Sequence, residues 1–395
     1  MNMEQLRQTY YNSAQQIEKS EHYVRFGKSP ANIESKFDES KYMDPPIMLR
    51  DDYYWLRDDS RTNKKVLDVL KSENELVETI MVSDSSNEIQ TKLYEEIKSY
   101  INETYESLPM PHGDKGWNSD YYYWVRTLEG KSYPIHMRTK QVDEKTVEVL
   151  LDENELAEGY NTFDLYGAVI NPFFNSNIFP LLDRGFVYAI AHIRGGSFLG
   201  TEWYENGKML NKMNTFNDFI SCTEHLITQS YTSVGNIVIE GSSAGGLLVG
   251  ATMVMRPELF RTVIAGVPFV DVLNTMCDPS IPLTTPEWEQ WGNPNEQIYY
   301  DYMKQYSPYD NIKPDTIYPN ILALGGLNDP RVQYWEPVKF IAKLRANDFS
   351  PTSNLKLLKT EMEQGHFGNT DRYKYMRETA FNYAFVFNTF EIDIL

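Results

Sequence analysis

A serine between two glycines is the feature of this sequence that most directly indicates chemistry. Residues 241–245 read GSSAG and fit the pattern G-x-S-x-G, in which the central serine stands at a sharp turn from a strand into a helix. Such a turn strains the serine backbone, and glycines are expected beside it because side chains there would clash. The apolar runs on both sides predict that Ser243 is a nucleophile beside a helix N-terminus, where developing negative charge is stabilised. The alternative is a glycine-rich turn in an unrelated α/β domain.

A nucleophilic serine needs a general base and a group that orients the base. In folds with this turn, the acid and then the histidine follow the serine, from loops at the carboxyl ends of later strands. Asp329 follows the apolar run 321–324, and His366, the only histidine after the turn, follows the run 355–358. Chain order therefore predicts a Ser243–His366–Asp329 triad. A helix-capping aspartate and a surface histidine are the alternatives.

Regular elements must bring these three residues together. From about residue 163 the sequence alternates between strand-like and helical patterns, which predicts a mostly parallel α/β sheet with helical crossovers. Apolar runs predict strands at 185–191, 236–240, 263–267, 321–324 and 355–358. The first of these is apolar throughout, as a strand buried on both faces requires. Helices are expected at 215–228 and 372–390.

The first 160 residues have a different pattern. Apolar residues recur at helical spacing between 66 and 77 and again between 89 and 101. Aromatic and β-branched runs then predict strands at 121–126, 132–137 and 147–151, the first two forming a hairpin.

Composition narrows the functional classes. The chain has 395 residues, of which 41% are hydrophobic, so it can bury a sizeable core. A net charge of −19 argues against nucleic acid and anionic membranes as partners, although simple solubility also explains it. Cys222 and Cys277 form neither a disulfide framework nor a metal-ligand spacing. Without a signal-peptide core or a membrane-length apolar run, we expect a cytoplasmic protein with no metal and no cofactor.

Many further stretches resemble the prolyl oligopeptidase family of serine peptidases, and within it the oligopeptidase B group. They are 54–59, 93–96, 181–187, 194–196, 214–218, 257–260, 267–271, 291–294, 306–310 and 333–337. The resemblance implies an N-terminal helical segment followed by a domain with an α/β-hydrolase-type fold. It implies that Ser243 is the nucleophile, Asp329 the orienting acid and His366 the general base. It also makes the Ala244 backbone N–H one oxyanion donor.

The resemblance implies short basic peptides as substrates. The oligopeptidase B group prefers cleavage after arginine or lysine and uses two glutamates two residues apart, which match Glu287 and Glu289 here. A carboxylate pair with an aromatic neighbour suits a guanidinium, and the alternative is a solvated acidic turn. Arg331 falls where the family often places an arginine that holds a substrate carbonyl, and its alternative is a salt bridge beside Asp329.

The sequence departs from the family in its middle. Family members carry a β-propeller, and at roughly 40–50 residues per blade the sequence here has room for at most one blade. We therefore expect a helical extension at 1–110, a β-hairpin remnant of the propeller at 111–160 and an α/β-hydrolase catalytic domain at 161–395.

A second departure lies closer to the predicted nucleophile. Phe163 aligns with the tyrosine that supplies the second oxyanion hydroxyl, and the loss of such a donor typically costs about 10²–10³ in rate. A sheet strand is missing beside 236–240, and 147–151 or 163–169 must fill the gap or leave an open seam. Asn171 and Phe173 replace the acidic pair of a second specificity pocket.

The sequence therefore supports a serine peptidase that cleaves after Arg or Lys through an acyl-enzyme on Ser243. Two alternatives stay open. One is a catalytically impaired family remnant that binds a partner or has no function, and the other is an esterase with an open site.

Overall fold

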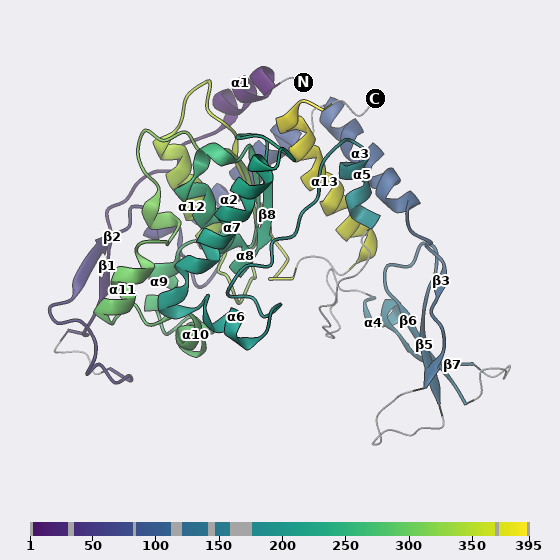
Figure 1. The fold of residues 1–395 in the computed structure, drawn as a ribbon, viewed down its shortest axis with the longest axis horizontal. Coiled ribbons are helices and arrows are strands. Elements are labelled where there is room, and N and C mark those ends of the chain that lie inside the picture. The colour runs from purple at the N-terminus through teal and green to yellow at the C-terminus, as the bar shows by residue number, and fades with distance from the viewer. Residues whose placement is uncertain are drawn as a thin grey trace.

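In the computed structural model a four-stranded parallel sheet organises the larger part of the molecule (Figure 1). The structure describes residues 3–30, 35–81, 84–111, 121–140, 147–158, 176–367 and 371–392. The sheet has the order β11-β10-β9-β8 and consists of β8 (Val238–Ser242), β9 (Thr262–Gly266), β10 (Asn320–Gly326) and β11 (Lys356–Glu361). Every neighbouring pair is parallel. The α/β-hydrolase-type fold and four of the five predicted strands are thus confirmed.

Helices cover both faces of this sheet because successive strand residues point to opposite sides. Val263 and Ala265 of β9 join one apolar core with α8 (Ala244–Met255) and α12 (Trp335–Asn347). Ile264 between them joins a second core with α13 (Arg372–Phe390), the predicted C-terminal helix. The remaining helices of this part are α5 (Phe179–Leu182), α6 (Thr201–Glu205), α7 (Met213–Thr228), α9 (Val272–Cys277), α10 (Thr284–Trp291) and α11 (Gln297–Met303).

The prediction of a fifth strand at 185–191 is wrong. Residues 185–191 follow α5 without forming a strand, and Val187 and Ile190 are 60% and 68% exposed. An apolar run becomes a buried strand only where a neighbouring strand satisfies its N–H and C=O groups. Within the described ranges β8 pairs with β9 alone, so no such neighbour stands beside this run.

The N-terminal segment packs against the sheet layers. It contains α1 (Met3–Ser13), α2 (Lys64–Met81) and α3 (Asp84–Ser99), with an antiparallel pair of strands, β1 (Tyr23–Phe26) and β2 (Ile47–Arg50), between α1 and α2. The two helices predicted from spacing are confirmed as α2 and α3. Val66 and Leu70 of α2 enter the first core, whereas Leu76 and Ile80 enter the second. One helix therefore contributes to both cores.

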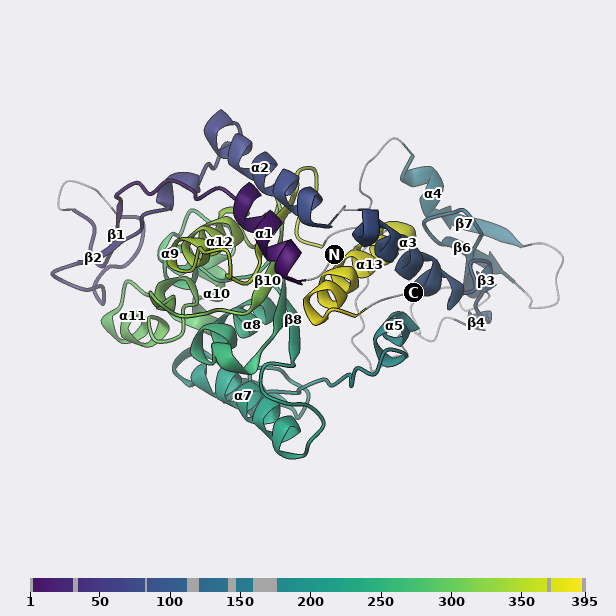
Figure 2. The same ribbon diagram turned by 90° about the horizontal axis from the view of Figure 1, so that it is seen from above.

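A small antiparallel sheet stands to one side of the body (Figures 1 and 2). It consists of β3 (Tyr105–Glu106), β4 (Met110–Pro111), β5 (Tyr122–Thr127), β6 (Ile135–Thr139) and β7 (Glu148–Asp152), followed by α4 (Glu153–Leu156). The predicted hairpin is confirmed as β5 and β6. β7 pairs with β6, so it does not fill the gap beside β8. The other candidate, 163–169, lies outside the described residues.

The chain leaves the body for this sheet and returns to it at nearly the same place. Arg184, just after α5, pairs with Glu96 of α3 through two nitrogens at 3.1 and 2.9 Å. Tyr100 donates a hydrogen bond to Asp183 at 3.2 Å, and its ring meets Phe179 edge-on. The two ends of the segment are therefore held together independently of what lies between them.

A buried ion cluster joins the N-terminal segment to the helices around the main sheet. Lys339 of α12 is almost fully buried, and its ammonium contacts Asp51 at 2.5 Å and also Asp271. Asp51 precedes the short helix η1 (Tyr54–Leu56), and Tyr309 donates to it at 2.7 Å. Burial and the nearby Asp271 charge raise the pKa of Glu336 to about 8. Lys339 is thus the cation that contacts both Asp51 and Asp271.

We predict that Lys339→Ala lowers the free energy of unfolding by about 3–5 kcal/mol, because it removes the ammonium that contacts two buried carboxylates. Urea denaturation would measure the change. The matched control is Lys64→Ala, which breaks the exposed pair with Asp68 on α2 and should change the unfolding free energy little. Equal small shifts for both variants would contradict a structural role of the cluster.

Candidate active site

Ser243 occupies a strained turn between β8 and α8. Its backbone has φ +57° and ψ −117°, a left-handed conformation that is unusual for a residue other than glycine. Its N–H donates to Gly266 at 2.9 Å, and its carbonyl accepts from Leu247 at 3.1 Å and Phe269 at 3.2 Å. These three bonds hold the strained conformation, which is typical of functional sites.

The glycines around Ser243 have different roles. A Cβ on Gly241 would lie 2.3 Å from the Gly245 carbonyl oxygen, so this position excludes a side chain. A Cβ on Gly245 would meet nothing within 4 Å, so the expectation that both flanking glycines are sterically required is wrong for this one. A Cβ on Gly246 would lie 2.5 Å from Pro268 Cα, a close approach that the sequence pattern did not predict.

The structure brings the three residues of the predicted triad together. His366 Nε2 lies 3.1 Å from Ser243 Oγ, and His366 Nδ1 lies 2.7 Å from Asp329 Oδ2. With the proton on Nδ1, the imidazole donates to Asp329 and accepts the serine proton at Nε2. This arrangement can move a proton from the serine hydroxyl to the histidine while the carboxylate stabilises the resulting imidazolium.

Asp329 is held by the loop that follows β10. The residue is fully buried, and its Oδ1 accepts backbone hydrogen bonds from Arg331 at 2.8 Å and Val332 at 3.0 Å. The Asn328 N–H donates to the Gln364 carbonyl at 3.0 Å, which ties this loop to the one that carries His366. The carboxylate therefore keeps one oxygen for the loop and one for the imidazole.

Ala244 is the first residue of α8. Like every first-turn N–H, its amide has no acceptor within its own helix. It lies next to Ser243 at the positive end of the helix dipole, as an oxyanion donor must. Phe163, Asn171 and Phe173 lie outside the described residues.

Glu287 and Glu289 both lie on α10, although not as a side-by-side pair. Positions two apart on a helix point about 200° away from each other. Glu287 is half-buried and accepts a hydrogen bond from the Trp291 indole at 2.8 Å. Glu289 is exposed, and after Glu205 it helps to raise the pKa of Lys208. The two carboxylates therefore have different surroundings.

Arg331 stands beside the histidine loop. Its side chain is exposed and its guanidinium lies 5.2 Å from the Phe367 ring centroid. Among the described residues no ion pair joins this guanidinium to Asp329, which the alternative interpretation expected.

Two basic residues that contact α10 or the Asp329 loop were not predicted. Lys212 is buried, its ammonium lies 4.9 Å from the Trp291 ring centroid, and burial lowers its pKa to about 8. Arg61 donates to the carbonyl of Leu327 at 2.8 Å, in the loop of Asp329. Neither lies in a sequence pattern that marks a site, although the family-like stretch 54–59 ends two residues before Arg61.

The described residues include no group of three His, Cys, Asp or Glu side chains that could hold a metal ion. The helices within those ranges are also too short or too polar to cross a membrane.

Comparison with known proteins places these features in a family. Residues 172–393 match the model of the prolyl oligopeptidase family, and residues 32–173 match that of the prolyl oligopeptidase N-terminal beta-propeller domain. Protease 2 of Moraxella lacunata is 49% identical over 228 residues, which are 58% of this chain and 33% of that protein. Dipeptidyl aminopeptidase BI of Pseudoxanthomonas mexicana is 48% identical over 221 residues, 56% of this chain and 30% of that protein. The chain thus spans about a third of the length of these curated relatives.

Solved structures share the fold. Oligopeptidase B from Leishmania major superposes with a TM-score of 0.85 at 23% identity, over 96% of this chain and 98% of that chain. Oligopeptidase B from Trypanosoma brucei gives a TM-score of 0.84 at 24% identity, over 96% and 99%.

We predict that Gly241→Ala disrupts the turn, because its methyl group would collide with the Gly245 backbone. The expected result is a loss of about 1–3 kcal/mol in stability and of reactivity at Ser243, measured by thermal unfolding and by labelling with a fluorophosphonate probe. Gly245→Ala is the matched control and should fold and label normally. A Gly241→Ala protein that labels like wild type would contradict the steric argument.

Proposed function

The chain belongs to the prolyl oligopeptidase family, and from this premise we propose that it is a serine peptidase that cleaves short peptides after arginine or lysine. The observation that carries the proposal is the continuous hydrogen-bonded chain from Ser243 through His366 to Asp329, with distances of 3.1 and 2.7 Å. In this proposal residues 161–395 form the catalytic domain. Residues 1–110 form a helical extension and residues 111–160 a remnant of the propeller.

The proposed reaction follows from the geometry. His366 Nε2 takes the Ser243 proton as Oγ attacks the substrate carbonyl, and the Ala244 N–H stabilises the oxyanion. His366 then protonates the leaving amine, and water hydrolyses the acyl-enzyme by the same steps. Asp329 keeps the imidazole in the required tautomer throughout. No cofactor takes part in this scheme.

The proposed preference for basic residues rests on α10. Glu287 is half-buried and fixed by Trp291, so a substrate guanidinium could pair with a carboxylate of defined position. Glu289, which is exposed, would contribute by charge rather than by a fixed contact. Arg331 is proposed to hold a substrate backbone carbonyl from the exposed side of the histidine loop. The net charge of −19 also favours cationic peptides over anionic partners.

Ester hydrolysis is the second candidate. Phe163 has no hydroxyl where the family donor tyrosine is expected, and an ester needs less transition-state stabilisation than an amide. If the oxyanion site is weakened in this way, ester turnover would survive better than amide turnover.

The test of the proposed function is labelling followed by turnover. Wild-type protein should react stoichiometrically with a fluorophosphonate probe, and Ser243→Ala should not react. His366→Ala should fold normally and label at least about 10³-fold more slowly, because the serine loses its base. Wild type should also hydrolyse an arginyl amide above the Ser243→Ala background. Ester hydrolysis without amide hydrolysis would favour the esterase, and absence of labelling in folded wild type would favour the impaired remnant.

We further predict that Glu287→Gln lowers kcat/KM for an arginyl substrate about 10–100-fold, the equivalent of one charge-assisted hydrogen bond. Activity on a matched phenylalanyl substrate should change little, so the ratio of the two reports specificity. Glu289→Gln should have a smaller effect because its carboxylate is exposed. Glu75→Gln, on the exposed side of α2, is the control. An unchanged ratio in Glu287→Gln would refute this specificity site.

A further inference from the structure

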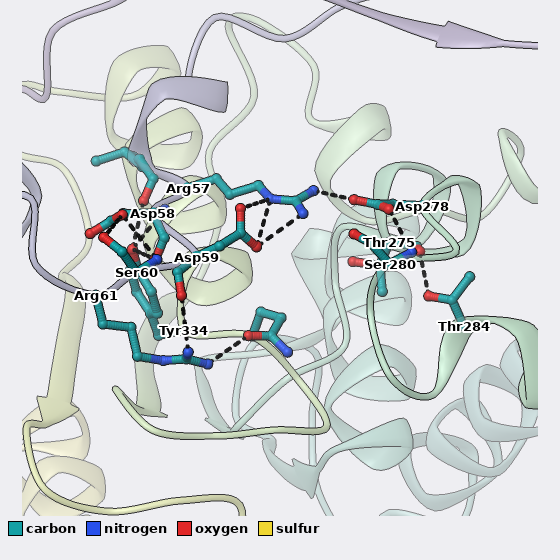
Figure 3. Close-up of polar contacts among 12 residues, drawn as sticks. Arg57, Asp58, Asp59, Ser60, Arg61, Thr275, Asp278, Ser280, Thr284 and Tyr334 are labelled. Atoms are coloured by element: carbon teal, nitrogen blue, oxygen red, sulfur yellow. Dashed lines mark hydrogen bonds and ion pairs between the residues drawn. The ribbon is translucent and has the colours of Figure 1, made fainter. Parts of the chain in front are cut away.

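A short stretch of the N-terminal segment is fastened to the loop that carries Asp329 (Figure 3). It lies between η1 and α2. Arg61 donates through Nε to the Leu327 carbonyl at 2.8 Å and through one terminal nitrogen to the side chain of Gln333 at 3.0 Å. The same nitrogen reaches the Asp329 carbonyl at 3.5 Å. One guanidinium thus joins three points of the loop.

The stretch is itself rigidly folded around Arg61. The Asp58 carboxylate accepts backbone hydrogen bonds from Thr62 and Asn63, each at 2.7 Å, and a side-chain bond from Ser60 at 2.6 Å. Arg61 has φ +55°, a left-handed conformation that is costly for a residue with a side chain. This conformation persists because the surrounding bonds enforce it.

A second contact fixes the far end of the same loop. Tyr334 directly follows Gln333, and its hydroxyl accepts from the Asp58 N–H at 3.0 Å and donates to the Leu56 carbonyl at 3.1 Å. The loop between Leu327 and Tyr334 is therefore held at both ends by the N-terminal segment. On its inner side the Asp329 carboxylate faces His366.

We infer that Arg61 is a positioning residue for the triad: it holds the loop backbone so that the Asp329 carboxylate stays aligned with the imidazole. The expected effect on turnover rests on the proposed function. The anchoring of the Asp329 loop by Arg61 does not. Arg61 donates to the Leu327 and Asp329 main-chain carbonyls, whereas the imidazole contacts the Asp329 carboxylate. Its effect must therefore pass through the loop.

Arg57 offers a control in the same stretch. Its guanidinium pairs with Asp278 at 2.6 Å and with Asp59, and it lies 5.0 Å from the Trp335 ring centroid. Its ion pair ties the stretch to the segment before α10 (Figure 3), and its ring contact is with Trp335 of α12, the residue after the loop of Asp329. Loss of either arginine removes a charged anchor of the same stretch, yet only the loss of Arg61 should loosen the acid loop.

Hydrogen exchange read by mass spectrometry tests the structural content without any need for activity. In Arg61→Ala the amides of Arg331 and Val332, which donate to Asp329, should exchange about tenfold faster than in wild type, while Arg57→Ala leaves them unchanged. Arg61→Lys, which keeps the charge but cannot bridge three acceptors, should show an intermediate rate and serves if the alanine variant does not fold. Unchanged exchange in a folded Arg61 variant would overturn the inference.

Kinetics tests the catalytic consequence. Arg61→Ala should lower kcat about 10²-fold with little change in KM, because a misplaced triad slows the chemistry without altering binding. Arg57→Ala should keep the wild-type kcat, even if its thermal midpoint falls as far as that of Arg61→Ala. Faster exchange with wild-type kcat would overturn the positioning role. Faster exchange in a protein whose wild type does not label at Ser243 would refute the proposed function and leave the loop anchoring supported.

Discussion

Parallel register is the constraint on which the rest of the site depends. The carboxyl ends of β8, β10 and β11 reach one edge of the sheet, and Ser242 and Leu324 both pair with Gly266 there. The loops that begin at this level need only a few residues to bring Ser243, Asp329 and His366 into contact. A shift between β10 and β11 would break both hydrogen bonds of the triad, because both end on His366, whereas a shift of β8 would break only the bond to Ser243.

The chemistry of the site could be predicted from sequence because it depends on local pattern and chain order. The turn around Ser243 has a pattern of its own, and each triad partner follows an apolar strand that the structure contains. The features that the sequence did not predict depend on contacts between residues far apart in the chain. The run at 185–191 has the composition of a buried strand, and its exposure depends on which strands are available as neighbours. Arg61 and Lys339 escaped prediction for the same reason, since their partners lie far away in sequence.

Helical geometry also limited what spacing could predict. Glu287 and Glu289 suggest a pair when they are read in a turn, yet on α10 they point in different directions. The family assignment, in contrast, was predicted correctly, because it rested on many separate stretches rather than on one. Residue types alone could not establish how the N-terminal segment is joined to the body through α2, the buried Lys339 cluster and the Asp58–Arg61 stretch. These contacts make that segment part of the same folded unit as the main sheet.

The ion pair between Arg184 and Glu96 has a consequence for how this architecture can vary. Because the segment that carries β3–β7 leaves and returns at points already held together, its ends do not have to be brought together by its own contacts. The entropy of closing such a loop grows only with the logarithm of its length, by about 0.6 kcal/mol for each doubling. Chains built on this plan can therefore lengthen or shorten the inserted sheet at little cost in loop-closure entropy.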